Sequence, residues 1–456
     1  MLLDRVFQPF LEKRPICVMA QAVLSRILDP NRLDDLFHRT AKRQYEHQLL
    51  FSSVIGLMAD VVLQVQPSVH AAYQSGNYDI QGSLNALYKK IDHLEPDLAA
   101  ALVRDSAEQT GSLVDELDAQ LDPWLPGYRC RVLDGNHLSA TEHRLEPLRT
   151  TWTAPLPGKV LVILDPQRMV AEDVVLIEDG HAQERSALDQ ISPKARPKDL
   201  WIADRNFGTI GFMADLDRRQ AKFLFRQHGT ITGTLLGKRR PIGRTDTGMV
   251  YEQKIKLEQA STGDQWVWRR VTVVLDQPTR DGDREIHLLT NLPKKIDARQ
   301  LANLYRNRWT IETVFGEITA TLACEINTLC YPKAALLVFC LALLAYNAVS
   351  VLKAALRSVH GERKMAEDIS NYYLSLELQQ TYDGMMVCIP LEHWSVFRDV
   401  SEATLAEWLT EVAGTINLSR YQKHRRGPKK KPPEKDQYKH GGHVSTARLL
   451  EAAAEP

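Results

Sequence analysis

Residues 200–226 read LWIADRNFGTIGFMADLDRRQAKFLFR, and this stretch predicts a strand, a helix and a second strand in succession. Its two ends, 200–203 and 222–225, are short runs of apolar residues typical of strands, whereas residues 211–220 have a helical pattern. Similar runs upstream predict strands at 131–133, 160–164 and 174–177, and a helix at 181–191. Strands that alternate with helices indicate an α/β layer with a mixed sheet.

The regions that flank this α/β layer have different patterns. Up to about residue 125 the pattern is helical, whereas glycines and threonines separate β-type runs at 251–257, 266–275 and 286–289, which predicts an all-β insertion. Asp297, followed three residues later by Gln300 as in a capping box, marks the start of a long helix, and helical texture continues to about residue 380. We therefore expect a helical N-terminal domain (1–125), a first part of the α/β core (126–228), a β-rich insertion (229–296), a second part of the core (297–370) and a helical C-terminal region with a basic tail (371–456).

Composition gives broad limits. The 456 residues are 44% hydrophobic and 25% charged, values typical of a soluble globular protein. A net charge of zero argues mildly against a DNA-binding protein, but local patches bind DNA, not averages. The six cysteines have no CxxC or zinc spacing, and the N-terminus has no apolar signal stretch, so we expect a cytoplasmic protein with reduced thiols. The apolar run at 334–352 predicts a buried core helix and no membrane span.

Two aspartates follow predicted strands. Asp134 comes directly after the run 131–133 and before Gly135, and Asp204 ends the run 200–203 in the same way. Carboxylates at the ends of neighbouring strands could together bind a hard cation such as Mg²⁺ through oxygen. For either aspartate alone, a turn or helix-cap role is the simpler interpretation.

A third carboxylate lies on the predicted long helix. Tyr305, Arg308 and Glu312 have offsets that place them at about 0°, 300° and 340°, hence on one helix face. The simpler interpretation is a surface salt bridge between Arg308 and Glu312. Trp309 and Phe315 on the same segment indicate, however, that part of this helix is buried.

These motifs together resemble bacterial insertion-sequence transposases of the DDE type, in the branch with a Tyr-x2-Arg-x3-Glu motif and an all-β insertion before the catalytic glutamate. The matching segments are 133–136 (LDGN), 203–208 (ADRNFG), 288–293 (LLTNLP) and 305–312 (YRNRWTIE). The resemblance covers roughly residues 130–350 and implies a ribonuclease H-like core. It also implies a metal-bound catalytic triad of Asp134, Asp204 and Glu312, with Mg²⁺ as the cofactor and Mn²⁺ as a substitute.

The same resemblance implies two-metal phosphoryl transfer. Such an enzyme cuts the transposon ends at their terminal inverted repeats and joins the freed 3′-hydroxyl to target DNA through a hairpin intermediate. It works as a homodimer in a synaptic complex at the bacterial nucleoid. Tyr305 and Arg308 would hold a phosphate. The family motif usually has a lysine seven residues after the glutamate; here Thr319 lacks that charge, which puts one DNA contact in doubt.

Further DNA contacts are expected outside the triad. Trp266 and Trp268 share a strand face in the β-rich insertion, where the family places an aromatic that receives a flipped base, although either could be sheet core. Arg226, at a strand end, is a weaker phosphate contact. A smaller basic group lies near the N-terminus at Arg39, Lys42 and Arg43. The strongest basic block, within 420–439, includes Arg425, Arg426, Lys429, Lys430 and Lys431 and is expected to bind phosphates, the alternative being a solvated tail.

Three alternatives remain open. The first is a catalytically silent DNA-binding relative of a transposase, which the missing lysine at position 319 favours. The second is a ribonuclease H-like nuclease without strand transfer. The third is a glycosidase that uses paired carboxylates without metal. Residues 233–239 lack the length and the Ser or Thr of a P-loop, and no Gly-x-Ser-x-Gly elbow is present, so neither a nucleotide cofactor nor serine hydrolase chemistry is expected.

Overall fold

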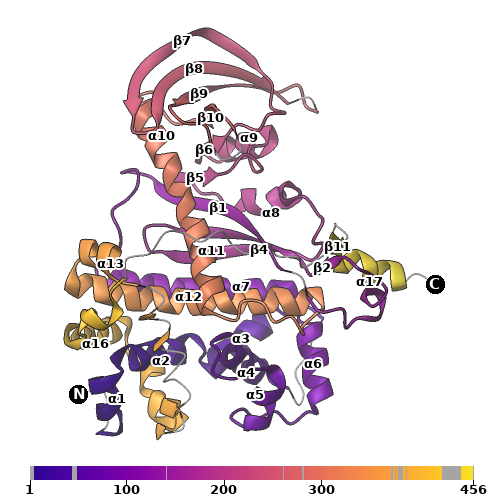
Figure 1. The fold of residues 1–456 in the computed structure, drawn as a ribbon, viewed down its shortest axis with the longest axis vertical. Coiled ribbons are helices and arrows are strands. Elements are labelled where there is room, and N and C mark those ends of the chain that lie inside the picture. The colour runs from indigo at the N-terminus through magenta and orange to yellow at the C-terminus, as the bar shows by residue number, and fades with distance from the viewer. Residues whose placement is uncertain are drawn as a thin grey trace.

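A nine-stranded mixed sheet forms the frame of the molecule in this computed structural model (Figure 1). The structure describes residues 5–43, 49–139, 141–259, 261–279, 282–370, 373–374, 376–377, 384–386, 388–423 and 443–454. The strands, in their order across the sheet, are β4 (Val170–Ile177), β3 (Lys159–Asp165), β1 (Arg129–His137), β5 (Asp199–Ala203), β6 (Lys222–Arg226), β10 (Glu285–Thr290), β9 (Gln265–Leu275), β8 (Gly248–Glu258) and β7 (Thr234–Thr245). The β1–β5 and β5–β6 pairs are parallel, and the other pairs are antiparallel.

The β-rich segment continues the main sheet instead of forming a sheet of its own. Strand β10 pairs with β6, with Leu288 opposite Arg226, and β9, β8 and β7 follow outward. The sequence did not predict β7, because this edge strand is exposed along most of its length and so lacks an alternating apolar face. The predicted helix at 181–191 is instead two 3-10 turns (Glu184–Ala187 and Ser192–Lys194) around the single turn of α8 (Leu188–Ile191).

Two long helices, α7 (Pro96–Glu116) and α12 (Pro332–His360), pack side by side and contact the sheet at β4 (Figure 1). Among the described residues, α12 is the helix that is long and apolar enough to cross a membrane, yet 94% of its most apolar window is buried inside the protein. It is therefore the central core helix, as the sequence predicted.

One polar residue in the middle of α12 has a structural explanation. Asn347 is fully buried, and its amide oxygen accepts from the Ala171 N–H at 2.8 Å while its nitrogen donates to the Ala171 carbonyl at 3.1 Å. Ala171 lies where the pairing of β3 and β4 shifts register, on the edge strand of the sheet. Asn347 thus satisfies two backbone groups that the irregular ladder leaves without strand partners.

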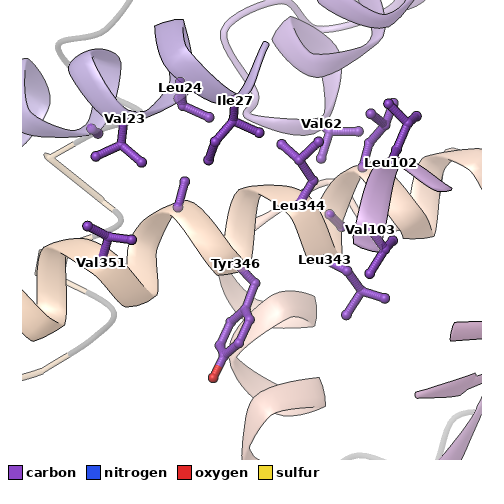
Figure 2. Packing of buried hydrophobic residues seen from close by; sticks show 14 of the residues in the cluster. Val23, Leu24, Ile27, Val62, Leu102, Val103, Leu343, Leu344, Tyr346 and Val351 are labelled. Carbon is purple, nitrogen blue, oxygen red and sulfur yellow. The ribbon is translucent and has the colours of Figure 1, made fainter. Parts of the chain in front are cut away.

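The N-terminal helices lie on the other side of α7 and α12 from the sheet (Figure 1). They are α1 (Gln8–Lys13), α2 (Pro15–Ile27), α3 (Pro30–Thr40), α4 (Phe51–Val62), α5 (Val69–Ser75) and α6 (Leu84–Asp92). Figure 2 shows side chains of α2 and α4 meeting those of α12, among them Ile27, Val62 and Leu344. The N-terminal region therefore shares one hydrophobic core with α12 and with the inner strands of the sheet.

The predicted long helix begins at the predicted cap but is interrupted. The Asp297 side chain accepts from the Arg299 N–H and starts α10 (Ala298–Arg306), a 3-10 turn spans Asn307–Trp309, and α11 (Thr310–Thr321) follows. In Figure 1 these elements run in succession from the β7–β10 end of the sheet down to α12.

The remaining elements close the fold around these layers. Helix α9 (Ile210–Arg218) packs on β6, and α13 (Glu362–Asp368) and α16 (Glu402–Thr415) contact α12. The short α15 (Val396–Asp399) packs on α2. The chain ends with β11 (His443–Ser445), which pairs in parallel with β2 (Ala154–Leu156), and with α17 (Thr446–Ala454). The basic block within 420–439 precedes these two elements in the sequence.

Candidate active site

The fold brings Asp134 and Asp204 to the same end of the sheet. Strands β1 and β5 are parallel neighbours with Leu133 opposite Ala203, so the next residue on each strand is an aspartate. An Asp134 carboxylate oxygen accepts from the Gly135 N–H at 2.9 Å, and an Asp204 oxygen accepts from the Asn206 N–H at 2.7 Å. These local bonds orient both carboxylates. The strand expected at 131–133 extends to His137, so Asp134 lies within β1, whereas Asp204 directly follows β5 as expected.

Arg308 connects Glu312 to Asp134, the first of the two aspartates. The Arg308 guanidinium donates one hydrogen bond to Asp134 at 2.6 Å and another to Glu312 at 2.7 Å. Glu312 lies in the first turn of α11, a helix that contacts β1. Sequence positions 134, 204 and 312 thus meet at one place, with a cation already between two of them.

Burial makes this cluster electrostatically strained. The Arg308 side chain is only 9% exposed and Asp134 15%, whereas Glu312 is 39% exposed. Burial raises the pKa of Asp134 to about 6; Arg308 opposes this increase, and the nearby Asp204 and Glu312 add to it. Arg308 therefore compensates only part of the negative charge, and the cluster would gain from a further cation.

Tyr305 lies beside this cluster, as the motif predicts. Its side chain is buried, and burial raises its pKa to about 12, with Asp204 and Arg308 among the charges that it senses. The phenol is therefore protonated and can donate a hydrogen bond. The Arg308 Nε is also buried, and no described residue accepts a hydrogen bond from it. A donor of this kind is suited to a ligand oxygen.

Two neighbours of the site were not found from the sequence. Glu184 lies against Gly135, where an added Cβ would come within 2.3 Å of its carboxylate. Burial and the nearby Asp204 raise the pKa of Glu184, and Asn206 bonds to it. The Trp309 ring is 61% exposed, with the Arg308 guanidinium 5.3 Å from its centroid. In the sequence, the glycine that directly follows Asp134 was the one indication that another side chain, here Glu184, comes close to this position.

Thr319 lies on α11, seven residues beyond Glu312, and is exposed. Its hydroxyl donates to the Phe315 carbonyl at 2.9 Å, a bond within its own helix. It lines a cavity of about 600 Å³ together with His137, Glu325 and His443. Thr319 therefore supplies no positive charge at the position where the family motif usually has a lysine.

The structure does not bring the two tryptophans to the triad. Trp268 is 4% exposed, packs edge-on against Phe223 and donates from its indole nitrogen to Asp217 at 3.2 Å, so it is a core residue. Trp266 is half-buried and stacks on Trp268 at 5.7 Å. Both pack with the core cluster under α9, whereas Tyr305 belongs to the cluster that contains α10.

The other candidate DNA contacts are scattered. Arg226, at the end of β6, is paired with Asp283 at 2.6 Å. Near the N-terminus, Lys42 pairs with Asp97 at 2.6 Å, and the backbone N–H of Arg43 donates to Glu95 at 2.9 Å. Arg39 donates to a carbonyl of its own helix. The basic residues Arg425, Arg426, Lys429, Lys430 and Lys431 lie outside the described residues.

A cavity of about 600 Å³ lies away from the triad, at the opposite ends of β1 and β5. Charged side chains line it, but they are largely paired with each other: Arg131 with Asp165 at 3.3 Å, and Arg168 with Asp115 at 2.5 Å. This network joins α7 to the sheet, so we assign it a structural role and place the chemistry at the carboxylates.

Two comparisons with known proteins gave a match. A family model described as "Transposase DDE domain" matches residues 125–348, a segment that contains all three carboxylates. A cryo-EM structure of the piggyBac transposase synaptic complex with hairpin DNA is similar at 11% identity and a TM-score of 0.38, over 90% of this chain and 87% of that chain. No curated protein matches the chain. Residues 125–348 of this protein are thus similar to a transposase DDE domain.

Proposed function

We propose that this protein is a metal-dependent DNA transposase that cleaves transposon ends and transfers the freed 3′-hydroxyl to target DNA. The observation that carries the proposal is the convergence of Asp134, Asp204 and Glu312 around Arg308 inside the segment that matches the transposase DDE domain. Three carboxylates from distant parts of the chain would be costly to gather without a function for their charge.

We also infer that the core is ribonuclease H-like. The inner strands support this, because three antiparallel strands, β4, β3 and β1, are followed by the parallel strands β5 and β6. The first two catalytic carboxylates follow adjacent parallel pairings, and the third is on a helix. The strands β10, β9, β8 and β7 would then be the insertion before the glutamate, joined edge to edge to the core sheet.

The donor set fits Mg²⁺ or Mn²⁺, since all three candidate ligands offer carboxylate oxygen. Among the described residues, no group of His, Cys, Asp or Glu side chains is already gathered as a metal site. Arg308 accounts for this, because it occupies the space between Asp134 and Glu312 that a metal ion would share. Asp134, Asp204 and Glu312 would hold the ions, whose contribution is to activate the attacking oxygen and stabilise the leaving oxygen.

The protein residues would then position the reacting phosphate. Water attacks the phosphorus at the transposon end, the bond to the 3′ oxygen breaks, and that oxygen takes a proton to become a 3′-hydroxyl. The hydroxyl next attacks a second phosphodiester and releases another 3′ oxygen; on the opposite strand this step gives a hairpin. Arg308, with its unpartnered Nε, and the protonated Tyr305 would donate to phosphate oxygens.

Cleavage of linear DNA that carries the flanking inverted repeats tests this proposal. We expect cuts at the repeat ends with Mg²⁺ or Mn²⁺, and none with Glu312→Gln. Joining of the freed 3′ end to a second duplex separates a transposase from a nuclease, and two ends held in one complex would support a homodimer. Cleavage that persists in Glu312→Gln would refute the assignment.

A catalytically silent DNA-binding relative is the second candidate. Thr319 favours it, because its hydroxyl is bonded within its own helix and cannot neutralise a phosphate. Specific binding of the repeats without cleavage under either metal would select this candidate. Thr319→Lys would then be the first change to make, with recovery of cleavage as the expected result.

A further inference from the structure

Two adjacent arginines on β9 point to opposite faces of the sheet and have different environments. Arg269 is 11% exposed and pairs with Glu252 at 2.6 Å. It also donates to the carbonyls of Leu292, Pro293 and Ile296 at 3.2, 2.8 and 2.9 Å. All of its bonds therefore go to the protein, and Arg269 holds the loop that leads into α10.

Arg270 lies on the α9 face, the same face as Trp268. Its Nε donates to Gln227 at 2.8 Å, but no carboxylate of the described residues lies within ion-pair distance of it. Burial lowers its pKa most, the attraction of Glu285 opposes this decrease, and the smaller repulsion by Arg239 adds to it. Burying a guanidinium without an anionic partner costs free energy, and an anion of a bound ligand would offset this cost by pairing with it.

The surroundings of Arg270 are also positive. Arg226 is neutralised by Asp283 at 2.6 Å and Arg239 by Glu285 at 3.1 Å, so Arg270 remains the excess charge. His287, bonded through its Nδ1 to Thr272 at 3.0 Å, lies in the same group. Burial lowers the pKa of His287 to about 4, and Arg270, Arg239 and Arg226 add to this decrease against Glu285. The histidine is thus neutral at physiological pH and senses any anion that enters.

We propose that Arg270, with Arg239 and His287 beside it, forms a phosphate-binding site for a single strand of DNA on the α9 face of the sheet. The proposal rests on the proposed function for its choice of ligand. Along β9, Trp266, Trp268 and Arg270 follow at every second residue. Trp268 is buried in the core, so the half-buried Trp266 is the ring of this row that a base could reach. Rings that stack bases beside cations that hold phosphates are the usual features of a single-strand binding surface.

This site is separate from the triad. Tyr305 and the α10 cluster pack on the other face of the same strands, where Val271 and Leu288 are buried. A strand bound at Arg270 would therefore follow the sheet on the side away from Tyr305. Under this proposal, DNA would be cleaved on the Tyr305 side of the sheet and bound on the α9 side.

The test uses His287 as a local reporter in full-length protein with isotope-labelled histidines. A single-stranded oligonucleotide of mixed sequence should raise the NMR-measured pKa of His287, because a phosphate beside the arginines offsets their repulsion. Arg270→Gln should abolish this response and lower the slope of log affinity against log salt by about 0.7. Arg270→Lys should retain the slope. The matched control is Arg244→Gln, an exposed arginine on β7 that is already paired with Asp276; it should behave as wild type.

Each outcome separates this proposal from that of the active site. Glu312→Gln protein should keep the His287 response even though it loses cleavage, and that response stands if the protein proves not to cut DNA. A His287 pKa that does not move with saturating oligonucleotide would overturn the phosphate site, and so would a protein that binds no oligonucleotide. An equal loss of slope in Arg244→Gln would show a general charge effect and equally overturn it.

Discussion

Arg308 is the residue on which the electrostatics of the site depend. It joins Asp134 to Glu312 and leaves its Nε without a partner among the described residues. Its role in the DNA-free protein is therefore that of an internal counter-ion. The sequence placed Arg308 on the correct helix face but could not show that it bonds to Asp134, because that contact spans 174 residues of chain.

Asp134→Asn protein should bind transposon-end DNA with near wild-type affinity, but its cleavage rate should fall by more than about 100-fold. The reason is that a neutral amide is a poorer ligand for a metal ion than a carboxylate. Gel-shift and cleavage assays on the same DNA provide the measurement. Asp35→Asn, a change on α3 far from the triad, is the control. Retained cleavage by the Asp134→Asn protein would contradict the assignment of the catalytic triad.

Asp92 on α6 offers a test of buried charge away from the site. Burial raises its pKa from 3.8 to about 6, so the folded state binds the proton more tightly than the unfolded state. Its contribution to stability is therefore fully present below pH 3.8 and is lost as pH rises to about 6. Asp92→Asn should raise the Tm at pH 7 and leave it nearly unchanged at pH 3.5. A gain in Tm of equal size at both pH values would show that burial of the Asp92 charge is not the cause.

At the scale of elements, the sequence predicted those strands whose buried faces leave a pattern. The strands predicted at 160–164 and 200–203 are confirmed. Strand β3 extends one residue beyond the first prediction at each end, and β5 begins one residue before the second. Strand β7 was missed because its exposed, basic sequence has no buried face to detect. The edge-to-edge join of β10 to β6 could not be predicted either, since strand pairing depends on tertiary packing.

Two glycines in the sheet, Gly248 and Gly135, should respond differently to substitution by alanine. At Gly248, which begins β8 with φ +157°, a Cβ would meet the Val274 carbonyl oxygen at 1.9 Å, and backbone cannot move away cheaply. At Gly135 it would meet the flexible end of Glu184. We expect Gly248→Ala to lower the free energy of unfolding by about 2 kcal/mol or more and Gly135→Ala by less than about 1 kcal/mol. Urea denaturation measures both, and equal losses would contradict this explanation.

At the scale of the whole molecule, the helices of the expected N-terminal domain share their hydrophobic core with the rest of the chain. Ile27 and Val62 pack against Leu344 in one hydrophobic core that also reaches the sheet (Figure 2). Periodicity identified the helices of this region, but it cannot show which faces meet. That information lies in long-range packing, which leaves no local signature.

A fragment that begins at residue 126 should therefore fail to fold as a stable protein, because α12 would expose the face that α2 and α4 cover. Full-length protein should unfold in a single urea transition, seen alike by tryptophan fluorescence and far-ultraviolet circular dichroism. A soluble fragment with a cooperative transition of its own would restore the two-domain interpretation.

The continuous sheet has a mechanical consequence. Because β10 pairs directly with β6, and Arg269 ties β9 to the loop before α10, no hinge separates the outer strands from the catalytic helix. The sheet therefore acts as a ruler of fixed length between Arg270 and Glu312. Under the two proposals made above, a DNA that binds at both residues would have to bend to fit that length.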